Sequence, residues 1–222
     1  MKSTMLQPLG AMLLAFGAGC DPPPKPPETP TIAHTLAPPA KCESLAENCL
    51  GKGDTRARIP KLGWTISPPT GWHYAQESDA TVAEKNGGAG AVVVATTFDS
   101  PKSPWELKKV RIDAIERLSK RVGVQLAQKN VIDVHLRDVP EKLELEGYKL
   151  SIWEQEGAKR ELAAGNVVVL VGSIDGRELL VLGFAPKADE ADSRALVDAI
   201  QSLKKQPPET DSGSAGPGGK SP

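Results

Sequence analysis

Apolar and polar residues repeat with different periods along this chain, and the periods predict several strands and two helices. Between residues 105 and 122 apolar residues recur every three or four positions, which is typical of a helix with one buried face. A second helix is predicted over residues 188–203. Apolar or alternating runs predict strands at residues 64–66, 81–85, 91–98, 131–136, 143–154, 166–173 and 178–184.

Local signals mark the ends of some of these elements. Ser103 is expected to cap the first helix, because Pro104 and Glu106 follow it in the order of a capping box. Asp175 and Gly176 suit a tight turn, so the last two strands are predicted to pair as a hairpin. Both strands of this hairpin are apolar runs, which places it near the centre of a sheet.

Composition divides the chain into four parts. Residues 1–19 are interpreted as a signal peptide, because Lys2 precedes an apolar run that is too short and interrupted to span a bilayer. Residues 20–57 are predicted to be a proline-rich linker that favours extended polyproline II. Residues 58–205 are expected to form one globular domain. Residues 206–222 are rich in Pro, Gly and Ser and are expected to be disordered.

The cysteines suggest two covalent modifications, a lipid at the end of the signal peptide and a disulfide in the linker. Small residues from Gly17 to Gly19 precede Cys20, and this resembles the lipobox of bacterial lipoproteins, whose cysteine receives a diacylglyceryl group. The match departs from the family at Gly17, where leucine is usual, and ordinary signal-peptidase cleavage before Cys20 is the alternative. Lipidation of Cys20 would leave an even pair, Cys42 and Cys49, which is interpreted as a local disulfide.

The order of elements resembles the PsbP-like superfamily, which includes DcrB-type bacterial lipoproteins. The resemblance rests on a Pro-Pro-x-Gly-Trp turn at residues 68–72, a capped helix after the first strands, and a closing hairpin and helix that ends at residues 199–204. It implies an α+β fold in which an antiparallel β-sheet carries helices packed on its faces. It also implies a non-enzymatic accessory or binding role, and it supplies no catalytic residue.

Net charge and the absence of known sequence motifs exclude several classes of function. A formal net charge of −1 gives no electrostatic attraction to nucleic acid, so no nucleic-acid partner is predicted. The sequence carries no phosphate loop and no zinc or calcium motif, so no cofactor and no metal site are predicted. The alternative to a binding role is an envelope hydrolase in which two carboxylates converge. The acidic residues considered for it are Asp133, Asp138, Glu141, Glu144 and Glu146.

Two groups of side chains are candidates for contact surfaces. The tryptophans Trp64, Trp105 and Trp153 are expected to pack in the core, whereas Trp72, in a glycine-proline turn, is the first choice for an exposed contact. The first helix is rich in basic residues, which are interpreted as a solvated face because acidic residues are interleaved. A patch for anionic headgroups is the alternative for Lys108, Lys109, Arg111, Arg117, Lys120 and Arg121.

The sequence therefore predicts a lipid-anchored binding or assembly module of the bacterial cell envelope that is not an enzyme. Its partners are expected to be the membrane, through the N-terminal lipid, and an envelope protein or glycan. The domain is expected to face the periplasm, with the choice between inner and outer membrane left open.

Overall fold

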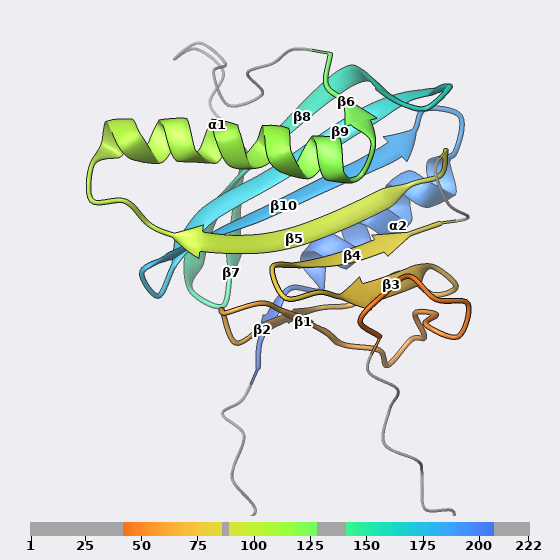
Figure 1. Ribbon diagram of the computed structural model, residues 1–222, viewed down its shortest axis with the longest axis horizontal. Helices are drawn as coiled ribbons and strands as arrows, with labels where there is room; N and C mark the ends of the chain where they lie inside the picture. The colour runs from red at the N-terminus through yellow and green to blue at the C-terminus, as the bar shows by residue number, and fades with distance from the viewer. Residues whose placement is uncertain (1–41, 86–88, 128–140, 207–222) are drawn as a thin grey trace, which may run out of the picture. The chain divides into compact units, whose positions relative to one another are not determined.

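The computed structural model describes residues 42–85, 89–127 and 141–206. These residues form a large antiparallel sheet, a small antiparallel sheet and two helices (Figure 1). The predicted α+β class, with an antiparallel sheet and helices on its faces, is confirmed.

The large sheet has eight strands among the described residues. They are β3 (His73–Gln76), β4 (Ala80–Glu84), β5 (Val92–Asp99), β6 (Val124–Gln125), β7 (Glu141–Leu145), β8 (Tyr148–Arg160), β9 (Ala163–Ile174) and β10 (Arg177–Pro186). Their order is β3-β4-β5-β10-β9-β8-β6, and β7 also pairs with β8. The hairpin of β9 and β10 is central, as its apolar runs predicted.

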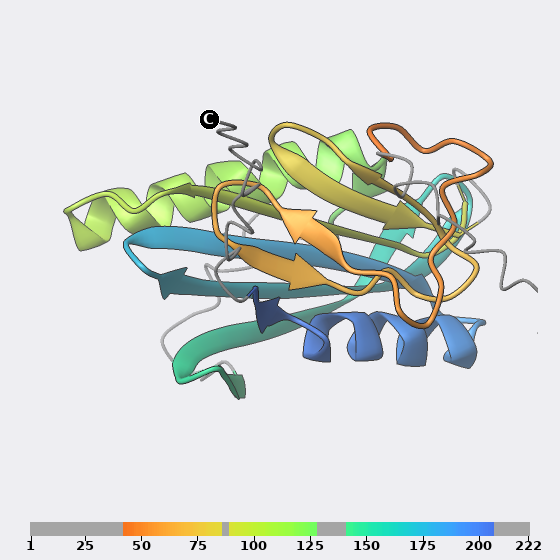
Figure 2. The same cartoon turned by 90° about the horizontal axis from the view of Figure 1, so that it is seen from below.

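The small sheet and the helices complete the described fold. The sheet has the order β1-β2-β11, with β1 (Ala57–Ile59), β2 (Trp64–Ile66) and β11 (Lys204–Lys205). The helices are α1 (Pro104–Arg121) and α2 (Glu190–Gln201). Figure 2 shows α1 and α2 on opposite sides of the large sheet.

Each face of the large sheet has its own apolar core, because alternate residues of a strand point to opposite faces. On β5, Val92 and Val94 belong to the core beneath α1, whereas Val93 and Ala95 belong to the core beneath α2. The central strand β10 alternates in the same way and is almost wholly buried. Burial on both faces explains why these strands are continuous apolar runs in the sequence.

A glycine lets α2 approach the sheet closely. A Cβ atom added to Gly183 of β10 would lie 2.2 Å from Cδ1 of Leu196, which is buried on α2. The N-terminal end of α2 is fixed as well, since the Asp189 carboxylate accepts a hydrogen bond of 3.0 Å from the Asp192 amide. Asp189 is therefore a true side-chain cap.

Two local predictions differ from the structure. Ser103 stands at the extended N-cap position of α1, but its side chain makes no capping hydrogen bond. The single strand predicted over residues 143–154 is instead the hairpin of β7 and β8, with positive φ at Glu146 (50°) and Gly147 (82°) in its turn. Glu-Gly is not the usual Asn-Gly or Asp-Gly signature, so the turn was missed. The strand predicted at 131–136 lies outside the described residues.

The segment before β1 belongs to the folded part, although the sequence placed it in the linker. Cys42 and Cys49 form a disulfide with Cα atoms 5.6 Å apart. The carbonyl of Cys49 accepts a hydrogen bond of 2.9 Å from the Tyr74 amide, and that of Cys42 accepts one of 2.6 Å from the Gln76 amide. These bonds cover the outer edge of β3, because an edge strand leaves backbone groups in need of partners.

A buried carboxylate fastens the first half of α1 to the sheet. Glu178 of β10 is fully buried, and its Oε2 accepts a hydrogen bond of 2.9 Å from Nε of Arg111. Its Oε1 accepts hydrogen bonds from the hydroxyls of Ser100 and Ser173. A buried carboxylate is stable only where charge and hydrogen bonds compensate for lost water, so Arg111 is held in place.

A buried arginine fastens the other end of α1. Arg160 of β8 is 4% exposed, and its Nε donates a hydrogen bond of 2.8 Å to the carbonyl of Val122, which follows the helix. Its other nitrogens reach the Gly90 carbonyl at 2.8 Å and the Glu84 carboxylate at 2.6 Å. Arg160 thus ties the carbonyl that follows α1 to β4 and to the turn before β5.

A third polar cluster links β8, the β9–β10 turn and β11. The Tyr148 hydroxyl donates a hydrogen bond to the Asp175 carboxylate, which also lies 3.1 Å from Nζ of Lys205. The bond from Tyr148, followed by that from Lys205, lowers the pKa of Asp175. The same carboxylate raises the pKa of Tyr148 and the pKa of Lys205.

We predict that Arg111→Ala lowers the free energy of unfolding by about 3 kcal/mol, because it leaves the buried Glu178 carboxylate without its cation. The matched control is Arg117→Ala on the same helix, which removes an exposed side chain and should change stability by less than about 0.5 kcal/mol. Urea unfolding followed by circular dichroism measures both. Equal stability of the two variants would contradict the role given to Glu178.

Candidate functional site

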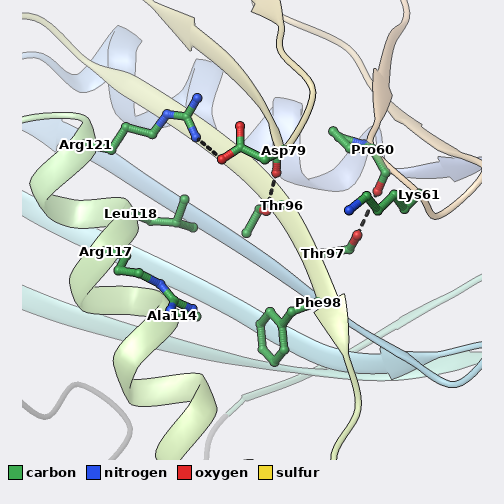
Figure 3. Close-up of a pocket in the computed structure, with 10 residues that line it drawn as sticks. All are labelled: Pro60, Lys61, Asp79, Thr96, Thr97, Phe98, Ala114, Arg117, Leu118 and Arg121. Atoms are coloured by element: carbon green, nitrogen blue, oxygen red, sulfur yellow. Dashed lines mark hydrogen bonds and ion pairs between the residues drawn. The ribbon is translucent and has the colours of Figure 1, made fainter.

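A groove of about 270 Å³ lies where α1, β5 and the turn between β1 and β2 come together (Figure 3). Its apolar part comes from Ala114 and Leu118 of α1 and from Phe98 of β5. Residues four positions apart lie on one side of a helix, so Ala114 and Leu118 point to the sheet together. The groove therefore exists because α1 stands beside β5 at this point of the sheet.

Two threonine hydroxyls hold the loops that border the groove. The Thr96 hydroxyl donates a hydrogen bond of 2.5 Å to the Asp79 carbonyl, and the Thr97 hydroxyl donates one of 2.7 Å to the Pro60 carbonyl. Both bonds are visible in Figure 3. They attach the turn before β4 and the turn after β1 to β5, so the border of the groove is formed before any ligand arrives.

The charged residues of the groove differ in whether they form ion pairs. Arg121 lies 2.9 Å from the Asp79 carboxylate and also forms an ion pair with Glu77. Lys61 and Arg117 are exposed, and neither side chain makes an ion pair or hydrogen bond within the described part of the chain. Figure 3 shows Arg117 extending from α1 towards β5, and Lys61 extending from the β1–β2 turn towards the same strand.

Lys61 has an unusual backbone conformation. Its φ is 60°, in the left-handed region that costs a residue with a side chain roughly 1 kcal/mol or more. The hydrogen bond from Thr97 to the neighbouring Pro60 carbonyl holds the turn in this place. The chain thus keeps a lysine at the border of the groove, where glycine would be relaxed.

A second hollow, of about 210 Å³, lies between the proline turn before β3 and α2. Lys52 and Asp198 are its charged lining residues. One cation is balanced there by one carboxylate, whereas the groove beside α1 has three cations and one carboxylate. The first groove is therefore the stronger candidate for a charged ligand.

The prediction that Trp72 forms an exposed contact surface is wrong. Trp72 is 4% exposed and belongs to the core beneath α2. Its backbone amide donates to the Pro69 carbonyl at 3.1 Å, and its own carbonyl accepts from the Gly51 amide at 2.8 Å. The turn folds inwards because the segment that contains Gly51 closes over it, which the composition of the turn does not reveal.

The tryptophan at the surface is Trp105, which is 75% exposed and was expected in the core. It precedes Ala114 by nine residues, so the two lie about 180° apart around the helix axis. Trp105 therefore faces away from the apolar stripe of α1. The signal was present in the sequence, since the spacing of the buried positions leaves Trp105 outside the stripe.

The remaining predicted site residues are not brought into the groove. Cys20, Asp133 and Asp138 lie outside the described residues, and Glu144 and Glu146 are exposed on the hairpin of β7 and β8. Glu141 begins β7. The described residues contain no group of three or more metal-ligating side chains placed to hold an ion. Within the same ranges, no helix is both long and apolar enough to cross a membrane.

The sequence matches no protein-family model and no curated protein. Among solved structures, the fold is similar to that of a protein from Bacteroides thetaiotaomicron VPI-5482, with a TM-score of 0.43 and 7% identity. The alignment covers 69% of this chain and 48% of that one, so the chain spans about half the length of the Bacteroides protein. It is also similar to the cyanobacterial PsbP (CyanoP) from Synechocystis sp. PCC 6803, with a TM-score of 0.44, 12% identity, and coverage of 68% of this chain and 91% of that one.

Proposed function

We propose that this chain is a lipid-anchored binding module of the bacterial cell envelope and that the groove beside α1 is its ligand site. The observation that carries the proposal is the groove itself, in which exposed cations without a partner among the described residues border an apolar surface. A concave site that joins apolar side chains to a few polar groups is typical of ligand binding.

The fixed border of the groove supports binding. The hydroxyls of Thr96 and Thr97 hold its loops, while Glu178 holds α1 at Arg111 and Arg160 holds its C-terminal end. A site that is already ordered loses little conformational freedom when a ligand enters, so more of the interaction energy appears as affinity. We propose binding rather than catalysis because the carboxylate of the groove, Asp79, is engaged by Arg121.

The sequence before the folded part supports the proposed address. Cys20 follows the small residues of a lipobox-like segment, and the described residues begin at Cys42. Twenty residues of polyproline II would extend about 60 Å, so a linker of this composition would let the domain meet partners away from the membrane surface. An envelope protein or glycan is the partner class that this address favours.

Anchoring is tested by Cys20→Ser in a bacterial host. We predict that the unaltered chain sediments with membranes and carries diacylglycerol on its first mature residue, whereas the variant is released or mislocalised, because the acyl chains hold the protein on the bilayer. Fractionation and mass spectrometry of the mature N-terminus provide the readouts. A variant that sediments just as before would contradict the proposed anchor.

Binding in the groove is tested by photo-crosslinking in intact cells. A p-azidophenylalanine placed at position 98 should give a discrete adduct, because Phe98 lines the groove. The matched control is the same residue at position 197, since Val197 is exposed on α2, on the other side of the large sheet. Equal adduct formation from both positions would argue against the groove as the ligand site.

A further inference from the structure

We propose that the ligand of the groove is a small amphipathic anion, with a carboxylate or phosphate head and an apolar group attached to it. This inference rests on the proposed function, because it names the chemistry of the ligand for the same site. It draws on three features of the groove, namely its unpaired cations, its apolar wall and the conformation of Lys61.

Lys61 and Arg117, which have no partner within the described residues, favour a ligand with an anionic head. Lys61 and Arg117 come from different elements and extend towards the same strand (Figure 3). Arg121 is engaged by Glu77 and Asp79, so it forms part of the border and is not free to receive a ligand. A guanidinium matches a carboxylate or phosphate with two parallel hydrogen bonds, and a nearby ammonium adds charge.

Charge also distinguishes the groove from the rest of the chain. The whole protein has 27 basic and 28 acidic residues, so an average patch of surface is close to neutral. The groove is lined by Lys61, Arg117 and Arg121 against the single carboxylate of Asp79. Glu77 also pairs with Arg121, so three cations face two carboxylates, and the resulting net charge of +1 favours an anion at this place.

The apolar wall of the groove favours a ligand that carries an apolar group next to its anionic head. Phe98, Ala114 and Leu118 line the same groove, and a free inorganic anion would leave them without a partner. An attached alkyl or aromatic group would cover them and gain the hydrophobic contribution of the buried area. The volume of about 270 Å³ lies just below the usual range of small-molecule sites, so it suits a short ligand or one end of a longer one.

Lys61 provides a way to separate binding from folding. Glycine adopts positive φ without strain, so Lys61→Gly should keep the turn while it removes the ammonium group. Arg117→Ala removes the guanidinium from an exposed position. The control is Lys120→Ala, which removes an exposed cation of the same helix that does not line the groove.

The test is calorimetric titration of the full-length protein, held in phosphatidylcholine nanodiscs, with hexyl phosphate, hexanoate, hexanol and inorganic phosphate. We expect hexyl phosphate and hexanoate to bind at least about tenfold more tightly than hexanol or inorganic phosphate, because only they use both halves of the groove. Lys61→Gly and Arg117→Ala should each weaken the binding of hexyl phosphate about tenfold, the change expected when one charged hydrogen bond is lost. Lys120→Ala should leave it unchanged.

Three results would overturn the inference. Hexanol that binds as tightly as hexyl phosphate would exclude the anionic head, and inorganic phosphate that binds as tightly would exclude the apolar group. If none of the four probes binds while the adduct from position 98 still forms in cells, the ligand class is wrong and the groove remains the site. Loss of that adduct as well would reject the proposed function itself.

Discussion

The position of α1 depends on charges that are buried in the sheet. Glu178 is fully buried on the central strand, and the arginine that compensates for it comes from α1. Arg160, at the C-terminal end of the helix, holds the carbonyl that follows it. Apolar packing alone allows a helix to slide or rotate over a flat surface, whereas these directional bonds hold Arg111 and Val122 at fixed places on the sheet.

The groove follows from this attachment. Because α1 is held at Arg111 and at its C-terminal end, the part of the helix between these points stands beside β5 and leaves a hollow bordered by Phe98, Leu118 and the turn that carries Lys61. The same helix supplies one arginine to the buried cluster and two, Arg117 and Arg121, to the groove. Arg111 holds the helix to the sheet, whereas Arg117, six positions further along, has no partner in the part of the chain that the structure describes, although both belong to one basic helix.

Much of the fold could be predicted from the sequence, because burial on a helix or strand leaves a periodic pattern. The stripe of α1 and the continuous apolar runs of β5 and β10 correspond directly to the two cores. The Asp175-Gly176 turn was equally clear, since both residues have positive φ as its type requires. The turn at Glu146 and Gly147 was missed because glutamate, unlike asparagine or aspartate, rarely adopts positive φ before a glycine.

The groove could not be predicted in this way. Its border combines Pro60 and Lys61 with Asp79, with Thr96 to Phe98 and with residues of α1, and no local pattern shows that these segments meet. The six basic residues of α1 appeared equivalent until the buried partner of Arg111 was known. Trp72 shows the same limit, because its burial depends on the distant segment that is fastened by the disulfide of Cys42 and Cys49.

Whether the groove beside α1 binds the ligand is tested most directly by NMR, with amide and methyl shifts followed during titration of the protein with hexyl phosphate. We expect the largest shift changes at Lys61, Phe98, Ala114, Arg117 and Leu118. Shift changes that instead cluster around the second hollow, at Pro68, Pro69 and Ala195, or that spread evenly over the surface, would contradict it.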